Sequence, residues 1–241
     1  MTGTTISLLC STLAVVGGPS ESPQFGYLNQ PAYSIDKCPR PPFVAYRPQP
    51  GDIILYSDSN IAWATLYAIA GTGAPGHSGL VTRMSDGELG VLEAGYNDKP
   101  WVRFIRLDER LPSYKGTCWV RRRKSPISAE QSQILTEFAE TIDGHRYGVL
   151  RLLAQLTPIR KRGPLRLYVM GKARGVRDTY ICSEAVLEGL VLAGLLDAET
   201  TRPSATYPRD LFFDSSPNRY LNRHFKLCGD WEIPQLWRRG P

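Results

Sequence analysis

Residues 76–94 read GHSGLVTRMSDGELGVLEA, and this stretch decides the expected fold. A β-rich run at residues 79–82 is followed by the turn signal SDGE at 85–88, and the stretch ends on the apolar run VLEA. Two such runs on either side of a glycine-containing turn predict an antiparallel hairpin. Such a hairpin would place His77 and Glu93 side by side.

Further strand and helix signals lie outside the hairpin. Three more strands are expected from short apolar runs, at residues 53–56, 101–107 and 118–122. Helix signals stand at residues 128–144, where a capping-box pattern precedes an apolar face, from Cys182 to Gly194, and at 207–211, where a short helix or turn is expected. The chain is therefore expected to be α+β, with a small, mostly antiparallel sheet flanked by helices.

The amino-terminal part of the chain is expected to differ from the rest. Residues 1–45 lack periodicity and are rich in Pro, Ser and Gly, which favours an extended arm that contacts a partner protein, ahead of one domain at 46–241. Residues 6–16 are apolar and have roughly the length of a signal peptide, yet no Lys or Arg precedes Lys37. Export or retention in the cell envelope follows if this run belongs to a signal, and a cytoplasmic location follows otherwise.

The balance of charge favours an anionic partner. The formal net charge is +6, which suits an anionic polymer, peptide or lipid substrate, and no specific binding of nucleic acid is expected. Seven cations fall between Arg160 and Arg177 with no acidic residue among them, in a basic insert at 158–177. One hypothesis makes this insert a flap that recruits an anionic substrate, and the alternative is a solvated loop. No run approaches the ~20 apolar residues of a membrane-spanning helix, so no transmembrane segment is expected.

One of the five cysteines stands out by its position. No CxxC pair occurs, so neither a disulfide framework nor a zinc site is indicated, and no metal or cofactor is expected. Cys182 stands where the run TYI ends and an apolar helix begins. The N-terminus of a helix favours the thiolate form and can stabilise a developing oxyanion. Cys182 is therefore predicted to be a nucleophile, and a structural cysteine at a helix start is the alternative.

A cysteine nucleophile needs a base and a group that orients the base. His77 stands at the entry of a predicted strand between small residues, which leaves its imidazole accessible. Glu93 interrupts an apolar run, and a buried carboxylate is costly unless it is paired. We therefore expect His77 to be the base and Glu93 to orient it. His145 and His224 are expected in polar loops or at the surface.

In this order the motifs resemble a known family. Gly51-Asp52-Ile53, Gly76-His77-Ser78-Gly79, Leu92-Glu93-Ala94 and Tyr180-Ile181-Cys182-Ser183-Glu184 are similar to the circularly permuted, YiiX-like branch of the NlpC-type papain-like cysteine amidases and peptidases. In that branch the histidine strand precedes the cysteine helix, as it does here. The resemblance spans roughly residues 46–215 and implies a papain-like sheet or half-barrel flanked by helices.

The resemblance also implies roles for single residues. It makes Cys182 the nucleophile, His77 the base and Glu93 the orienting third residue, and Tyr147 an oxyanion or substrate contact. Ser78 and Tyr180, within the same motifs, are further candidate substrate contacts.

Three functions follow from these residues and this resemblance. The first is hydrolysis of an amide bond through an acyl-enzyme, of peptidoglycan stem-peptide or γ-glutamyl type. The second is thiol-dependent cleavage or transfer of a lipid acyl group, because the lecithin:retinol acyltransferase group shares the permuted order. The third is a non-enzymatic component of a larger assembly.

Overall fold

The computed structural model describes residues 24–29, 43–57, 73–95, 99–148, 165–214 and 226–240. Several predictions concern residues outside these ranges and are not tested by the structure. They concern the apolar run 6–16, Cys10, Cys38, Arg160, Lys161, Arg162 and His224.

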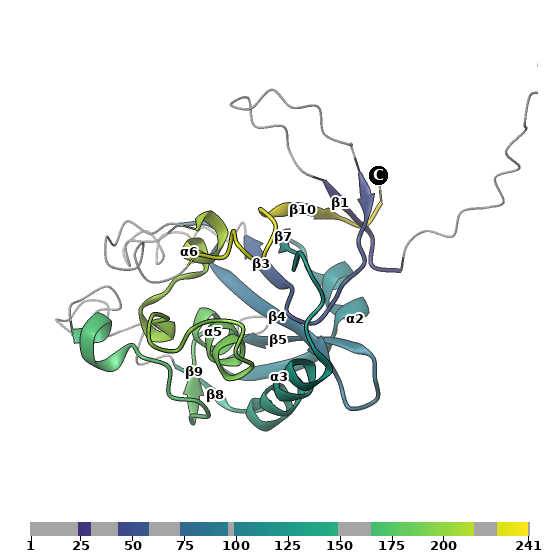
Figure 1. Ribbon diagram of the computed structural model, residues 1–241. Helices are drawn as coiled ribbons and strands as arrows, with labels where there is room; N and C mark the ends of the chain where they lie inside the picture. Colours follow the sequence, from purple (N-terminus) through teal and green to yellow (C-terminus); the bar gives the residue numbers. More distant parts are fainter. Residues whose placement is uncertain are drawn as a thin grey trace, which may run out of the picture.

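One large antiparallel sheet organises the described residues (Figure 1). Its strands run in the order β2-β1-β10-β7-β3-β4-β5-β6, and every neighbouring pair is antiparallel. The strands are β1 (Tyr27–Asn29), β2 (Val44–Ala45), β3 (Ile53–Ser57), β4 (His77–Arg83), β5 (Leu89–Ala94), β6 (Val102–Arg106), β7 (Thr117–Arg121) and β10 (Gln235–Arg238). A separate parallel pair joins β8 (Arg146–Tyr147) to β9 (Thr179–Tyr180). The α+β class and the antiparallel pairing were thus correctly predicted, but the sheet has eight strands within the described residues and is larger than the small sheet expected.

The expected hairpin is formed by β4 and β5. Gly79 pairs with Glu93 across the two strands, and Gly87 in the turn has a φ of 88°. A Cβ atom at position 79 would lie 2.6 Å from a methyl group of Val91 and 2.9 Å from Cγ of Glu93. Gly79 therefore makes room for the Glu93 side chain on the neighbouring strand.

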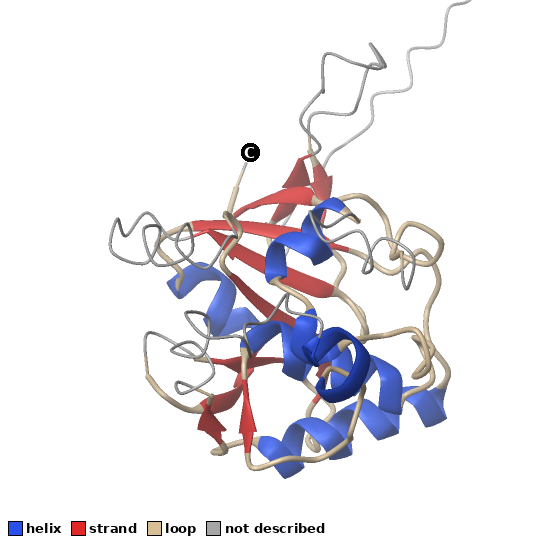
Figure 2. Cartoon of the chain, turned by 90° about the vertical axis from the view of Figure 1, so that its left-hand side faces the viewer, coloured by secondary structure: helices blue, strands red, loops and turns tan. Residues whose placement is uncertain are grey.

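Helices cover both faces of the sheet (Figure 2). They are α2 (Leu107–Ser113), α3 (Ala129–Ile142), the π-helix η3 (Arg166–Met170), α5 (Cys182–Leu192), the 3₁₀-helix η4 (Pro203–Ala205) and α6 (Pro208–Phe213). α3 has the expected capping box between Ser128 and Gln131, and it packs with α5 against one face. α2 packs against the other face. Among the described residues, no helix has the length and apolar character needed to span a membrane.

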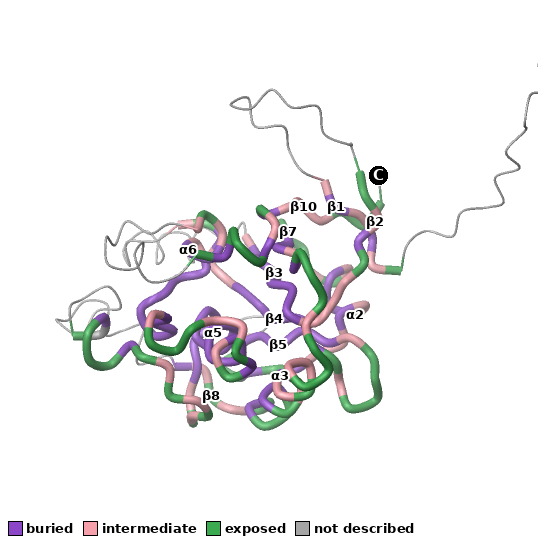
Figure 3. Tube along the Cα trace, in the orientation of Figure 1, coloured by how far each residue is buried: buried purple, intermediate pink, exposed green. Residues whose placement is uncertain are grey.

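The residues of the central strands β3, β4 and β5 are mostly buried (Figure 3), and they pack into cores on both faces of the sheet. Along β3 and β4, Ile53 and Leu80 pack into the core formed with α3 and α5, while Ile54 and Val81 pack into the core formed with α2. Successive residues of a strand point to opposite faces, so each strand contributes to both cores. This double burial explains why the strands contain near-continuous apolar runs.

The expected arm at residues 1–45 needs a correction. Two of its segments are strands of the large sheet, since β1 pairs with β10 and with β2. Tyr27 lies opposite Arg238, more than two hundred positions along the chain. Strands of two or three residues carry no readable periodicity, and their partners are far away in the sequence, so local patterns could not reveal them.

Candidate active site

Cys182 is the first residue of α5 and is almost completely buried. Ile181 before it is extended, and its N–H donates to the carboxylate of Glu184 at 3.4 Å, which closes the first turn of the helix. Sγ of Cys182 lies 3.9 Å from the carbonyl oxygen of Gly76, next to the start of β4. The positive end of the α5 dipole therefore lies at the thiol, where it favours a negative sulfur.

His77 opens β4 and contacts both expected partners. Its Nε2 lies 3.0 Å from Oε2 of Glu93, and the imidazole also forms a hydrogen bond with the Cys182 side chain. A carboxylate can only accept, so Nε2 carries a proton and Nδ1 is left to face the thiol. Burial lowers the pKa of His77, but the hydrogen bonds and charges of Cys182 and Glu93 outweigh it and raise the pKa to about 9. The surroundings thus favour the imidazolium form of His77.

Glu93 on β5 is completely buried and fully hydrogen-bonded. Besides His77, it accepts two hydrogen bonds of 2.9 Å from Nε and Nη2 of Arg110 and a short one from the hydroxyl of Tyr56. Burial raises the pKa of Glu93, but His77 and Arg110 outweigh this effect and lower the pKa to about 2. The carboxylate therefore stays charged and cannot rotate away from the imidazole.

Arg110 and Tyr56 are site residues that the sequence reasoning missed. Arg110 lies on α2 with a side chain that is only 2% exposed, and its guanidinium lies over the rings of Tyr56 and Tyr114 at 5.1 and 5.0 Å. A signal was present, because Arg110 and Leu111 stand three and four residues after Leu107 and so share its helical face. A cation on an apolar helix face requires a buried anionic partner.

The three predicted substrate contacts are placed differently. Tyr147 is half-buried on β8 and pairs with β9, which leads directly into α5. Tyr180 is completely buried in the core, and its hydroxyl accepts from the Arg177 N–H at 2.7 Å and donates to the Gly175 carbonyl at 3.2 Å. Ser78 is also completely buried, and no hydrogen-bond partner of its hydroxyl occurs among the described residues.

The predicted contacts of Ser78 and Tyr180 with substrate therefore need a correction. Both residues were candidates because they stand in the motifs of His77 and Cys182. In a strand, however, neighbouring residues point to opposite faces. Ser78 lies on the same face of β4 as Leu80 and pairs across the sheet with Leu55 on β3. Leu80 and Leu55 both belong to the core that packs on α5. Only Tyr147 stays a candidate substrate contact.

The other described cysteines have different surroundings. Cys118 is buried, and burial, opposed by Arg110, raises its pKa to about 12. Cys228 is exposed, and all three described cysteines are free thiols. Within the described ranges, no cluster of three or more His, Cys, Asp or Glu side chains is arranged to hold a metal ion.

The described part of the basic insert is not uniformly solvated. Lys172 and Arg174 are exposed, and Lys172 forms an exposed ion pair with Glu199. Arg177 instead turns inward and pairs with two buried glutamates of α5. The inward position of Arg177 therefore fits neither hypothesis for the basic insert, the substrate-recruiting flap or the solvated loop.

Comparison with known proteins finds similarity to solved structures, and no match among family models or curated proteins. The solved structure of the metalloprotein YiiX from Escherichia coli O157:H7 is 19% identical, with a TM-score of 0.42, over 78% of this chain and 89% of that chain. A TM-score of this size is too low to assign the fold, so the permuted papain-like assignment stays a prediction.

Proposed function

We propose that this protein is a cysteine-dependent hydrolase with a permuted papain-like site, which cleaves an amide bond through an acyl-enzyme. The observation that carries the proposal is the continuous contact from the Cys182 thiol through His77 to the buried Glu93. A thiol at the start of a helix, an imidazole beside it and a carboxylate behind the imidazole are the parts that thiol hydrolysis needs.

The first half of the proposed reaction forms the acyl-enzyme. The Cys182 thiolate attacks the carbonyl carbon of the substrate, and the electron pair of the C=O bond moves to oxygen. The positive end of α5 stabilises this oxyanion. As the tetrahedral intermediate collapses, the His77 imidazolium gives its proton to the leaving nitrogen, the C–N bond breaks and a thioester remains on Cys182.

The second half releases the acid. Neutral His77 takes a proton from water, the water oxygen attacks the thioester, and the C–S bond breaks to restore the thiolate–imidazolium pair. Glu93 keeps the imidazole in one tautomer throughout. Because Arg110 already pairs with Glu93, the carboxylate contributes more to orientation than to charge.

Two substrate classes are proposed for this site. The favoured class is the amide bond of peptidoglycan stem peptides or of γ-glutamyl compounds, whose carboxylates suit a chain with a net charge of +6. The second is a lipid acyl ester. It is favoured by four exposed apolar side chains in or beside η3, before the nucleophile in the sequence: Leu165, Tyr168, Val169 and Met170.

A panel of electrophilic probes, some peptide-like and some lipid-like, tests both the proposal and the choice of substrate. We expect a probe to label Cys182 covalently, the label to disappear in Cys182→Ala, and the label to persist in the matched control Cys118→Ala. Stronger labelling by lipid-like probes would select the second substrate class. Folded wild-type protein in which no probe labels Cys182 would contradict the proposal.

A further inference from the structure

Two glutamates on the nucleophile helix are completely buried. Glu184 and Glu188 lie on α5, whose remaining buried side chains are mostly apolar. Buried carboxylates are costly unless they are paired and hydrogen-bonded, so both need a partner. Burial raises the pKa of Glu188, while Arg177 and the N–H groups of Arg174 and Gly175 act in the opposite direction.

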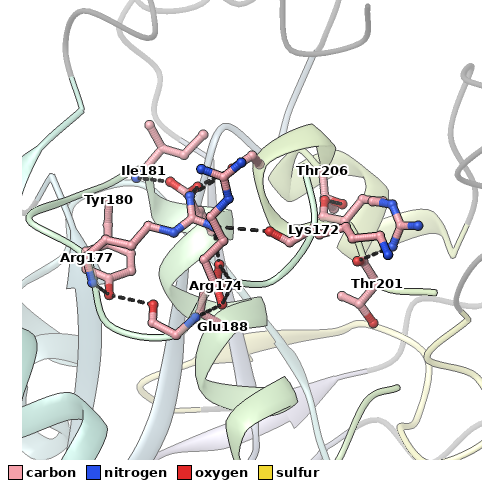
Figure 4. A network of polar contacts seen from close by, with 12 residues as sticks. Lys172, Arg174, Arg177, Tyr180, Ile181, Glu188, Thr201 and Thr206 are labelled. Carbon is pink, nitrogen blue, oxygen red and sulfur yellow. Dashed lines mark hydrogen bonds and ion pairs between the residues drawn. The ribbon is translucent and has the colours of Figure 1, made fainter. Parts of the chain in front are cut away.

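Arg177 bridges the two glutamates (Figure 4). Its Nη1 lies 2.6 Å from Oε1 of Glu184, and its Nη2 lies 2.6 Å from Oε1 of Glu188. Nη1 also donates to the hydroxyl of Ser204 at 3.2 Å, and that hydroxyl makes a short hydrogen bond to Glu184. The guanidinium presents its N–H donors in a rigid, planar fork that is preorganised for two carboxylates, whereas a lysine ammonium is a flexible point charge.

The main chain around Arg177 is held as firmly as its side chain. Its N–H donates to the hydroxyl of Tyr180, and its carbonyl oxygen lies 2.7 Å from Nδ1 of His145. The N–H groups of Arg174 and Gly175 donate to Glu188 at 3.0 Å. The segment that precedes the nucleophile is therefore fastened to the nucleophile helix through these glutamates.

Glu184 links this cluster to Cys182. Glu184 stands two residues after Cys182. Its carboxylate accepts a hydrogen bond from the N–H of Ile181, the residue directly before Cys182. A carboxylate near a thiolate disfavours the thiolate, because like charges repel. Arg177 cancels this charge while it leaves the Ile181 hydrogen bond in place. On the other side of the thiol, the charged groups are His77, Glu93 and Arg110.

We infer that Arg177 is a positioning residue for the nucleophile: it holds the first turn of α5 through Glu184 and neutralises that carboxylate, which belongs to the same helical turn as the thiol. This inference rests on the proposed function, since it concerns the reactivity of Cys182. Arg177 acts through Glu184 and touches no reacting atom.

The test is the pH profile of Cys182 alkylation by iodoacetamide, followed by mass spectrometry. In Arg177→Gln, we expect the midpoint of Cys182 alkylation to rise by about one pH unit, which lowers the rate by about tenfold at pH values below the wild-type midpoint. The double variant Arg177→Gln/Glu184→Gln also removes the uncompensated carboxylate from the first turn of α5. Its midpoint of alkylation should return most of the way to the wild-type value. Arg174→Gln is the matched control, because it removes one exposed cation from the same segment, and its profile should match the wild type.

A purely structural role predicts a different result. In that case Arg177→Gln lowers the thermal midpoint and leaves the alkylation profile of the folded protein unchanged, which would overturn the inference. If Arg177→Gln does not fold, Arg177→Lys is measured instead, and it should give a smaller rise in the midpoint; an unchanged profile would again overturn the inference. A wild-type Cys182 without activated reactivity would instead count against the proposed function itself.

Discussion

Two buried ionic clusters flank the thiol, and they differ in what they leave available for chemistry. On the sheet side, Glu93 and Arg110 neutralise each other, and His77 stands between this pair and Cys182. On the helix side, Arg177 pairs with two buried carboxylates of α5, those of Glu184 and Glu188. Both clusters use an arginine fork on buried glutamates. The sheet-side cluster places an imidazole, that of His77, beside the sulfur, whereas the helix-side cluster consists of ion pairs between Arg177 and carboxylates.

Removing the thiol should have the largest effect. Cys182→Ala should abolish turnover, because no other group can form the acyl-enzyme, and Cys182→Ser should nearly do so, because a hydroxyl is a much weaker acid. This loss would be measured as the initial rate of hydrolysis of a substrate from the class, peptide-like or lipid-like, whose probes label Cys182 best. Both variants should keep the wild-type thermal midpoint within a few degrees. Substantial turnover by Cys182→Ala would move the chemistry to another residue.

Breaking the sheet-side ion pair should have the next largest effect. Arg110→Met leaves Glu93 buried without its cation, so we expect a loss of about 3–5 kcal/mol in unfolding free energy. Adding Glu93→Gln removes the stranded charge and should recover part of that stability. Denaturant unfolding of the two variants measures both values. Arg110→Met with wild-type stability would mean that the Arg110–Glu93 pair is not a structural requirement.

A smaller effect on turnover is expected from Glu93→Gln alone. It keeps the shape of the side chain but loses the charge that fixes the tautomer of His77, so the rate should fall by one to four decades, about 1.4–5 kcal/mol. Because Arg110 already neutralises Glu93, we expect the lower half of this range. A rate equal to that of the wild type, with Cys182→Ala inactive, would leave the nucleophile in place and reject Glu93 as the third residue.

The pH dependence of stability should show the smallest effect. The pKa of His77 is raised in the folded protein from 6.5 to about 9, so its stabilising contribution is complete below 6.5 and is lost as the pH rises through about 9. The difference in thermal midpoint between wild type and His77→Gln should therefore shrink over this interval. His145→Gln, a histidine outside the sheet-side cluster, is the control and should show no such convergence. A constant difference between wild type and His77→Gln would contradict the raised pKa.

The parts of the fold and site that sequence could predict are those with local signals. The β4–β5 hairpin has its turn residues, α3 has its capping box, and Glu93 is conspicuous as a charge within an apolar run. The hydrogen bond between Glu93 and His77 was expected from this hairpin, and it is present.

What the sequence could not predict depends on contacts between distant residues. The pairing of β1 with β10 brings together residues 27–29 and 236–238, which are more than two hundred positions apart in the sequence. α2 was missed because it is short and contains Pro112, and Arg110 was missed with it. The burial of Ser78 and Tyr180 depends on which face of each strand meets α5, which the motif alone does not specify. The inward turn of Arg177 needs the positions of Glu184 and Glu188, because cations in a basic run usually face solvent.

The most direct test of the central claim is the rate of Cys182 alkylation by iodoacetamide at about pH 6, in wild type and in His77→Ala. An activated thiol keeps a large thiolate fraction below the ordinary cysteine pKa of about 8.5. The account predicts that wild-type Cys182 reacts faster at this pH than Cys118 and Cys228, and that His77→Ala removes the preference. Equal labelling of the three thiols in the folded wild type, unchanged by His77→Ala, would contradict an activated nucleophile.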